Sequence, residues 1–127
     1  MRLGIDIGTS NSCAYAWVGD GPPEVVLSEM GEHTTPSLIA FTDKTRLVGT
    51  SARLQQFANP DNTIGEFKRV VGRRYNDKEL WKYAKNWPMS LTECGDNDVG
   101  FRVRHLGKPQ VLRVIDLYKI LIEYFIT

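Results

Sequence analysis

The most informative segment of the chain is Leu3-Gly4-Ile5-Asp6-Ile7-Gly8-Thr9-Ser10-Asn11-Ser12. Its apolar beginning predicts a short strand over residues 2–7, and Asp6 lies within that strand. A carboxylate that is buried without a partner costs free energy. A hydrated Mg²⁺ beside a phosphate would relieve that cost. Asp6 is therefore a candidate residue for a magnesium site.

The residues that follow this strand predict a turn that could bind phosphate. Gly8 allows the backbone to come close to a ligand, and the amides and hydroxyls of Thr9, Ser10 and Asn11 could converge on phosphate oxygens. The turn lies between two predicted strands, so it is not a Walker P-loop, and the pattern GxGxxG is also absent. The alternative is an ordinary hairpin, in which backbone amides satisfy Asp6 at the end of the strand.

A second candidate group of residues is basic. Residues 63–71 predict a helix that Gly72 closes, and this helix carries Lys68 and Arg69. A lysine delivered to a phosphate would stabilise the negative charge that develops during phosphoryl transfer. The alternative is a solvated basic cluster that favours the dipole of the helix C-terminus, and the composition alone favours that alternative.

The composition excludes several classes of protein. The chain has 127 residues, of which 42% are hydrophobic and 24% are charged, as in a globular α/β protein. The net charge of +1 gives no reason to expect a nucleic-acid partner. Cys13 and Cys94 have neither disulfide-framework nor zinc-ligand spacing, and no run is apolar enough to predict a membrane span or a signal peptide. We therefore expect a reduced, cytoplasmic compartment and no membrane partner.

The remaining elements are predicted from apolar runs and turn residues. Strands at residues 2–7, 13–18 and 24–27 predict an antiparallel meander, and a loop over residues 28–37 follows. Further strands are expected at 38–41, 46–48, 89–92 and 100–105, and further helices at 50–57 and 77–85.

The last predicted helix covers residues 111–126. Its charged residues would form one narrow stripe: Arg113, Asp116, Lys119 and Glu123. Exposure of the apolar remainder would be costly, at about 25 cal/mol per Å². We therefore expect the sequence to be part of something larger, or to associate through this helix.

Several motifs in the same order resemble the start of the nucleotide-binding domain of the seventy-kilodalton heat-shock chaperone family. The similarity extends over about residues 3–88. The motifs that carry it are Gly4-Ile5-Asp6-Ile7-Gly8-Thr9-Ser10-Asn11-Ser12, Gly31-Glu32-His33-Thr34-Thr35-Pro36-Ser37, Phe41-Thr42-Asp43, Arg46-Leu47-Val48-Gly49, Asn59-Pro60, Phe67-Lys68-Arg69-Val70-Val71-Gly72-Arg73 and Trp87-Pro88.

The resemblance implies part of an actin-like (ribonuclease H-like) ATPase lobe, with an antiparallel or mixed sheet and flanking helices. Residues 1–35 would hold the first strands of the lower subdomain with the phosphate loop. Residues 36–110 would form the upper subdomain, and residues 111–127 a helix that returns to the lower subdomain. The three segments would make a single incomplete domain.

The resemblance also implies roles and partners. Asp6 would organise Mg²⁺ through water, Thr9 and Ser10 would hold the β- and γ-phosphates of ATP or ADP, and Gly8 and Asn11 would shape the turn. Lys68 matches the family's catalytic lysine. The full-length protein would bind unfolded clients and co-chaperones (J-domain proteins and nucleotide-exchange factors), and the 127-residue chain alone would be inactive.

The resemblance has departures, and other functions stay open. Ser10 stands where threonine is common, His33 stands where Asn or Arg is frequent, and residues after 93 match loosely. One alternative is a sugar kinase of the same fold, although Thr34-Thr35-Pro36-Ser37 and Phe67-Lys68-Arg69 favour the chaperones. The other is a truncated, non-enzymatic paralogue or interaction module.

Overall fold

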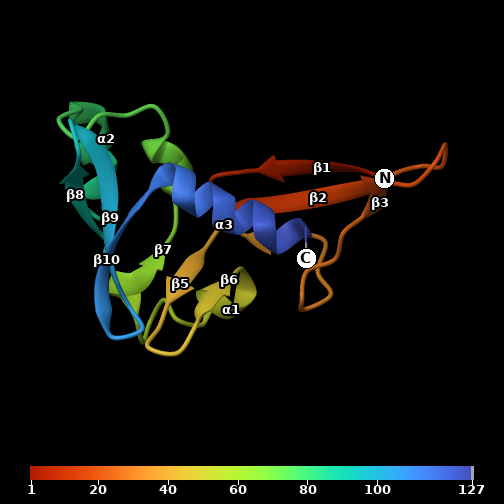
Figure 1. The fold of residues 1–127 in the computed structure, drawn as a ribbon, viewed down its shortest axis with the longest axis horizontal. Coiled ribbons are helices and arrows are strands. Elements are labelled where there is room, and N and C mark those ends of the chain that lie inside the picture. Colours follow the sequence, from red (N-terminus) through yellow and green to blue (C-terminus); the bar gives the residue numbers. More distant parts are fainter. Residues whose placement is uncertain (127) are drawn as a thin grey trace.

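Three small antiparallel sheets, linked by short helices, make up the chain in the computed structural model, which describes residues 1–126 (Figure 1). The strands of the first sheet are β1 (Arg2–Ile7), β2 (Asn11–Trp17), β3 (Glu24–Val25) and β4 (Thr35–Pro36). The strands of the second are β5 (Ile39–Phe41), β6 (Arg46–Val48) and β7 (Thr63–Ile64). The strands of the third are β8 (Ser90–Cys94), β9 (Asp98–His105) and β10 (Lys108–Arg113).

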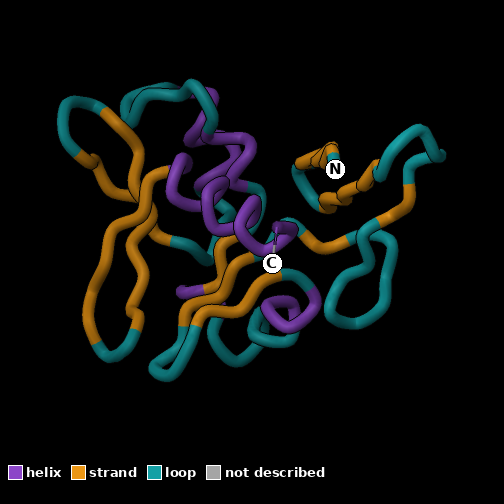
Figure 2. Tube along the Cα trace, turned by 45° about the vertical axis from the view of Figure 1, so that its right-hand side comes forward, coloured by secondary structure: helices purple, strands orange, loops and turns teal. Residues whose placement is uncertain are grey.

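The helices of the described residues are short except for the last one. The α-helices are α1 (Thr50–Arg53), α2 (Lys78–Ala84) and α3 (Val114–Ile126), and the 3-10 helices are η1 (Pro60–Asn62) and η2 (Phe67–Val70). In Figure 1, α3 runs from the end of β10 back toward β1 and β2, and Figure 2 shows it between the strands of the third and first sheets. This helix therefore connects the two ends of the molecule.

The predicted meander at the start of the chain is confirmed. β1 pairs with β2 in antiparallel register, with Ile5 opposite Ala14 and Asp6 opposite Cys13, and β2 pairs in turn with β3. Successive side chains in a strand point to opposite faces. Ile5 therefore packs against the core, as do its apolar neighbours two residues away, and Asp6 lies on the opposite, exposed face.

Three predicted helices differ from the structure, and two of them lie between residues 50 and 71. Residues 63–71 do not form one helix, because Thr63 and Ile64 extend the second sheet as β7 and Glu66 adopts a left-handed conformation with φ of 53°. Only the single 3-10 turn η2 follows. The helix predicted over residues 50–57 ends early, since α1 covers only Thr50–Arg53.

The helix predicted over residues 111–126 begins three residues late. Leu106 and Gly107 have φ of 54° and 75°, which is the conformation of a tight hairpin turn, and β10 therefore pairs with β9. Arg113 thus ends a strand instead of joining the predicted charged stripe. Within residues 1–126 the helix buries one face (Leu117, Ile120, Leu121 and Phe125). Ile115 stays 72% exposed, so the described part of this chain does not cover the whole helix, and the expectation that cover comes from elsewhere stays a prediction.

The start of α2 gives a prediction for stability against pH. The Asp77 side chain accepts a hydrogen bond from the backbone N–H of Glu79, and this bond, with the nearby Arg73, lowers the pKa of Asp77 from its usual 3.8. A lowered pKa means that the contribution to stability is present above about pH 4 and is lost as the pH falls through the folded-state pKa. We expect Asp77→Ala to lower the thermal midpoint by a few degrees at pH 7.

At pH 2 the difference between this variant and the wild type should shrink. Asp43→Ala is the matched control, because Asp43 is exposed and its side chain makes no hydrogen bond or ion pair within residues 1–126. Thermal denaturation followed by circular dichroism measures both. An equal loss at pH 2 and pH 7 would contradict the role of the charged carboxylate.

Candidate functional site

The turn between β1 and β2 is closed by the backbone itself. The Gly8 N–H donates to the Asn11 carbonyl at 3.0 Å, across Thr9 and Ser10. A Cβ atom at Gly8 would lie 2.5 Å from the Asn11 carbonyl oxygen, closer than real contacts of this kind. The close approach of the two backbone segments therefore requires glycine at position 8, a reason that differs from the approach to a ligand expected from the sequence.

Ser37, which the sequence analysis did not single out, holds this turn from outside. Its hydroxyl donates to the Gly8 carbonyl at 2.9 Å, and its backbone N–H donates to the Ser10 carbonyl at 2.9 Å. The Ser12 and Ser37 hydroxyl oxygens are 2.7 Å apart. Because Ser37 uses its only proton on Gly8, Ser12 is the donor in that pair. The signal in the sequence was Ser37 at the end of the Thr34-Thr35-Pro36-Ser37 run.

The hydroxyls of Thr9 and Ser10 remain free to bind a ligand. Within residues 1–126 neither side chain makes a hydrogen bond, and both residues line a cavity of about 320 Å³. Arg53 and Gln56 line the same cavity from the end of α1. Neither Asp6 nor Lys68 lines it, so the cavity covers only one side of the turn.

The structure corrects the premise on which Asp6 was first chosen. Its side chain is exposed rather than buried, because Asp6 lies on the outer face of β1. No cost of burying a charge therefore calls for a cation. The carboxylate instead stands at the end of β1 with no hydrogen bond or ion pair to any residue in 1–126, and it is available to bind a ligand from solvent.

Lys68 reaches the same turn from a distant part of the sequence. Its Nζ atom donates to the Ile7 carbonyl at 2.8 Å, and the two residues are 61 positions apart. Ile7 lies between Asp6 and Gly8, so the ammonium group stands beside the proposed phosphate turn. The lysine side chain is exposed, which leaves its other two N–H donors open to a bound anion.

The other basic residues near Lys68 face elsewhere. Arg69 pairs with Glu66 at 3.0 Å and stacks 4.6 Å above the ring of Tyr83. Arg73 pairs with Asp77 at 3.2 Å. Ion pairs therefore hold Arg69 and Arg73, whereas Lys68 donates to Ile7, the last residue of β1 before the turn.

Buried aromatic contacts fix the position of η2. Phe67 is 1% exposed, and its ring meets that of Tyr118 on α3 edge-on, with centroids 5.6 Å apart. Val70, at the other end of η2, is also buried. Burial raises the pKa of the Tyr118 phenol above its usual value. The contact of Phe67 with α3 therefore fixes the backbone position of the next residue, Lys68.

The available residues are compatible with a magnesium ion that is bound mainly by water and phosphate. Within residues 1–126 no three His, Cys, Asp or Glu side chains gather as a set of metal ligands. Mg²⁺ commonly keeps several waters and takes only one or two carboxylates together with phosphate oxygens. The single free carboxylate of Asp6 beside the turn meets that requirement.

Removal of the Ser37 hydroxyl should loosen the turn. Ser37→Ala leaves the Gly8 carbonyl and the Ser12 hydroxyl without their partner, and buried polar groups of this kind cost about 1–3 kcal/mol each when unpaired. We expect lower stability in urea denaturation, and faster hydrogen exchange at the amides of the turn. Ser90→Ala is the control, because Ser90 is exposed and its side chain makes no hydrogen bond within the described residues. Equal effects of the two substitutions would contradict the clamp.

Comparison with known proteins gives one consistent result. The family model described as Hsp70 protein matches residues 2–118. A ribosome-associated molecular chaperone of Zygosaccharomyces rouxii is 39% identical over 108 residues, which is 85% of this chain and 17% of that protein. The chain thus spans about a sixth of the length of this curated relative. Among residues 1–126, no helix has the length and apolar character needed to span a membrane.

Proposed function

Because the chain belongs to the Hsp70 family, we propose that it supplies the phosphate-binding turn and the catalytic lysine of an ATP-dependent molecular chaperone. ATP or ADP with Mg²⁺ would be its ligands, and hydrolysis would be coupled to protein folding. The family assignment removes the basis for a sugar kinase. In the complete protein the partners would be unfolded clients, J-domain proteins and nucleotide-exchange factors, in the cytoplasm.

The observation that supports this function most is the contact between Lys68 Nζ and the Ile7 carbonyl at 2.8 Å. It joins the two motifs that the sequence analysis selected independently. It brings a positive charge to a turn that carries two free hydroxyls, Thr9 and Ser10, and lies next to the free carboxylate of Asp6. A cation, a carboxylate and small donors around one point are the groups that phosphoryl transfer uses.

In this proposal each residue acts on the phosphate end of the nucleotide. The backbone at Gly8 and Asn11 shapes the turn, and the hydroxyls of Thr9 and Ser10 donate to phosphate oxygens. The Lys68 ammonium orients the attacking water or the γ-phosphate and stabilises the charge that develops on it. Asp6 holds the waters around Mg²⁺, and that ion, when bound, neutralises charge on the phosphate oxygens.

The proposed architecture is part of an actin-like lobe. Residues 1–35 form the beginning of the lower subdomain, residues 36–110 the upper one, and residues 111–127 the return to the lower one. The antiparallel sheets and the position of α3 between them are compatible with this division. The chain is 17% of the length of its relative, so we propose that other parts of a complete protein supply the contacts to adenine and ribose.

ATP binding by the complete protein tests the proposal. Gly8→Ala places a methyl group 2.5 Å from the Asn11 carbonyl oxygen and must displace the turn. We expect isothermal titration calorimetry with ATP and Mg²⁺ to show affinity about tenfold or more below wild type, since a loss of 1.4 kcal/mol is tenfold. Gly21→Ala is the control, because its added methyl would meet its nearest atom at an ordinary 3.6 Å.

The same titration decides between an ATPase and the remaining alternative, a non-enzymatic interaction module. A wild-type protein that binds no ATP would favour the module and contradict the proposed function. Equal affinities of wild type and Gly8→Ala would show that nucleotide binds away from this turn.

A further inference from the structure

Another cavity, of about 440 Å³, is lined by Val70 at the end of η2 and shares no lining residue with the cavity beside Thr9 and Ser10. Arg73 and Arg74 line it from the segment that follows η2, and Arg113 lines it from the end of β10. Asp98, at the start of β9, is the one carboxylate among its lining residues in the described chain. Three arginines and one aspartate thus line the same cavity.

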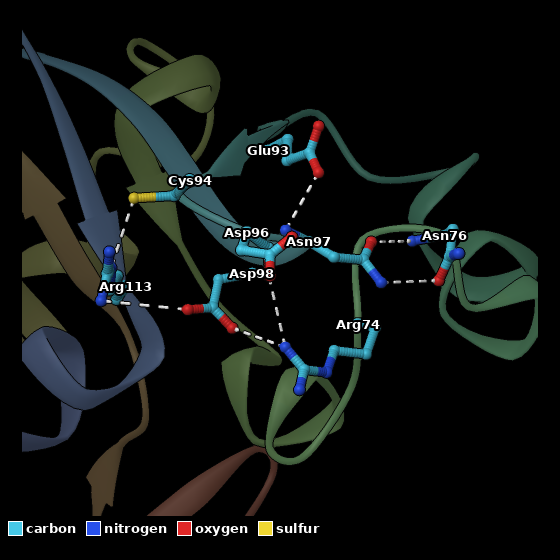
Figure 3. Close-up of polar contacts among 8 residues, drawn as sticks. All are labelled: Arg74, Asn76, Glu93, Cys94, Asp96, Asn97, Asp98 and Arg113. Atoms are coloured by element: carbon cyan, nitrogen blue, oxygen red, sulfur yellow. Dashed lines mark hydrogen bonds and ion pairs between the residues drawn. The ribbon is translucent and has the colours of Figure 1, made fainter.

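The single carboxylate is shared by two of the arginines, as Figure 3 shows. Asp98 Oδ1 lies 3.4 Å from Arg74 Nη1, and Asp98 Oδ2 lies 3.9 Å from Arg113 Nη1. Both contacts are long for charge-assisted hydrogen bonds, which are commonly about 2.7–2.9 Å. The one carboxylate of Asp98 cannot neutralise both guanidinium groups, so a net positive charge remains between Arg74 and Arg113.

Two other carboxylates, those of Asp77 and Asp116, are already used on backbone groups. Asp77 pairs with Arg73 but also accepts the Glu79 N–H at the start of α2. Asp116 accepts the backbone N–H of Arg113 at 2.9 Å, at the start of α3. Neither Asp77 nor Asp116 lines the cavity. Their charges reduce the local positive potential without filling the space between Arg74 and Arg113.

The other N–H donors of Arg74 and Arg113 either bind uncharged acceptors or have no acceptor among the described residues. Arg74 also donates to the Asp96 carbonyl at 3.3 Å, and Arg113 Nε donates to the Cys94 sulfur at 3.3 Å (Figure 3). Each guanidinium has five N–H donors. Within residues 1–126, most of the donors of Arg74 and Arg113 therefore have no protein acceptor, although both side chains are held in place.

The rest of the cavity is apolar. Val70 and Val99 are buried residues that line its inner part, and Val114 and Ile115 line it from the first turn of α3. Ile115 is 72% exposed. A large apolar side chain beside open guanidinium groups suits a ligand that carries both an acid and an apolar group.

We propose that this cavity binds an acidic segment of a partner protein, in which a glutamate or aspartate precedes an aliphatic residue. The carboxylate enters between Arg74 and Arg113, where planar guanidinium groups bind carboxylates through paired hydrogen bonds. The aliphatic side chain packs on Ile115. A nucleic acid is disfavoured because the chain has a net charge of only +1 and because Ile115 offers nothing to a phosphate backbone. The proposal does not depend on nucleotide binding.

The test uses the complete protein and a fluorescein-labelled synthetic peptide with two glutamates followed by isoleucine. A second peptide carries glutamines in place of the glutamates. We expect fluorescence anisotropy to show binding of the acidic peptide only, weakened by salt. The double variant Arg74→Gln with Arg113→Gln should lose about tenfold in affinity. Arg102→Gln is the matched control, an exposed arginine on β9 that does not line the cavity.

A further variant is expected to bind the acidic peptide more tightly, so its result cannot be explained by misfolding. Asp98→Asn removes the competing carboxylate, so affinity for the acidic peptide should rise severalfold, which a damaged fold would not produce. Failure of the wild type to bind the acidic peptide overturns the proposal, as does equal binding of the glutamine peptide. Competition by inorganic phosphate or a short single-stranded DNA at equal strength also overturns it, because the site would then recognise phosphate.

Discussion

Lys68→Ala in the complete protein is expected to lower the steady-state rate of ATP hydrolysis by about 10²–10³-fold, while ATP affinity changes little. The physical reason is that a positioned donor which stabilises developing charge acts mainly on the transition state. The ammonium group already lies beside the proposed phosphate turn, 2.8 Å from the Ile7 carbonyl, so its loss removes charge without removing the turn. Single-turnover hydrolysis and calorimetry of ATP binding measure the two effects separately.

Lys82→Ala is the matched control for this variant. Lys82 is an exposed lysine on α2 whose ammonium pairs with Glu79 at 2.8 Å, and it does not line the cavity beside Thr9 and Ser10. Hydrolysis by Lys82→Ala should stay at the wild-type rate. An unchanged rate in Lys68→Ala, or an equal decrease in both variants, would rule out the catalytic role of Lys68.

Phe67→Ala is expected to have the largest effect on stability, with a loss of about 3–5 kcal/mol in the free energy of unfolding. Phe67 is 1% exposed and fills the space between η2 and α3, where it contacts Tyr118. Its removal leaves a cavity and releases the segment that carries Lys68. We therefore expect the variant to lose hydrolysis as well, even at temperatures where it remains folded.

Phe67→Leu distinguishes the effect of losing buried volume from the effect of losing the aromatic ring. It keeps most of the buried volume, so it should cost much less than the alanine variant and retain hydrolysis. Chemical denaturation with urea measures the free energies. A loss below about 1 kcal/mol in Phe67→Ala would mean that η2 is not anchored through this ring.

The parts of the fold that could be predicted are those in which the pattern is local. The strands β1 and β2 follow from an apolar run on each side of a turn of small residues, and their antiparallel pairing is confirmed. The helix over residues 63–71 was wrong because Thr63 and Ile64 pair with β5, a contact across the second sheet that no local propensity reveals. β10 was missed because the Leu106–Gly107 turn carries no strong sequence signal.

The same distinction applies to the candidate site. Gly8 was selected because glycine lets the backbone approach a ligand, which stays a prediction. The structure adds a different reason that lies within four residues, since a Cβ atom at Gly8 would meet the Asn11 carbonyl oxygen. Asp6 was selected for a cost of burial that the structure does not contain, because the burial of a strand residue depends on what covers each face. Ser37 went unrecognised because its role depends on the pairing of β4 with β2. The roles of Asp6, Gly8, Thr9, Ser10, Asn11 and Lys68 in nucleotide binding stay predictions.

The contact that joins Lys68 to Ile7 also has a consequence for the order of folding. It connects residues 61 positions apart, so it closes a long loop, whose entropic cost must be met before the contact forms. The β1–β2 hairpin is local and can form early, whereas Lys68 arrives only after the intervening strands and η2 have assembled. In refolding experiments, hydrogen-exchange protection should therefore develop in the hairpin first, and catalytic competence should be recovered in the last kinetic phase.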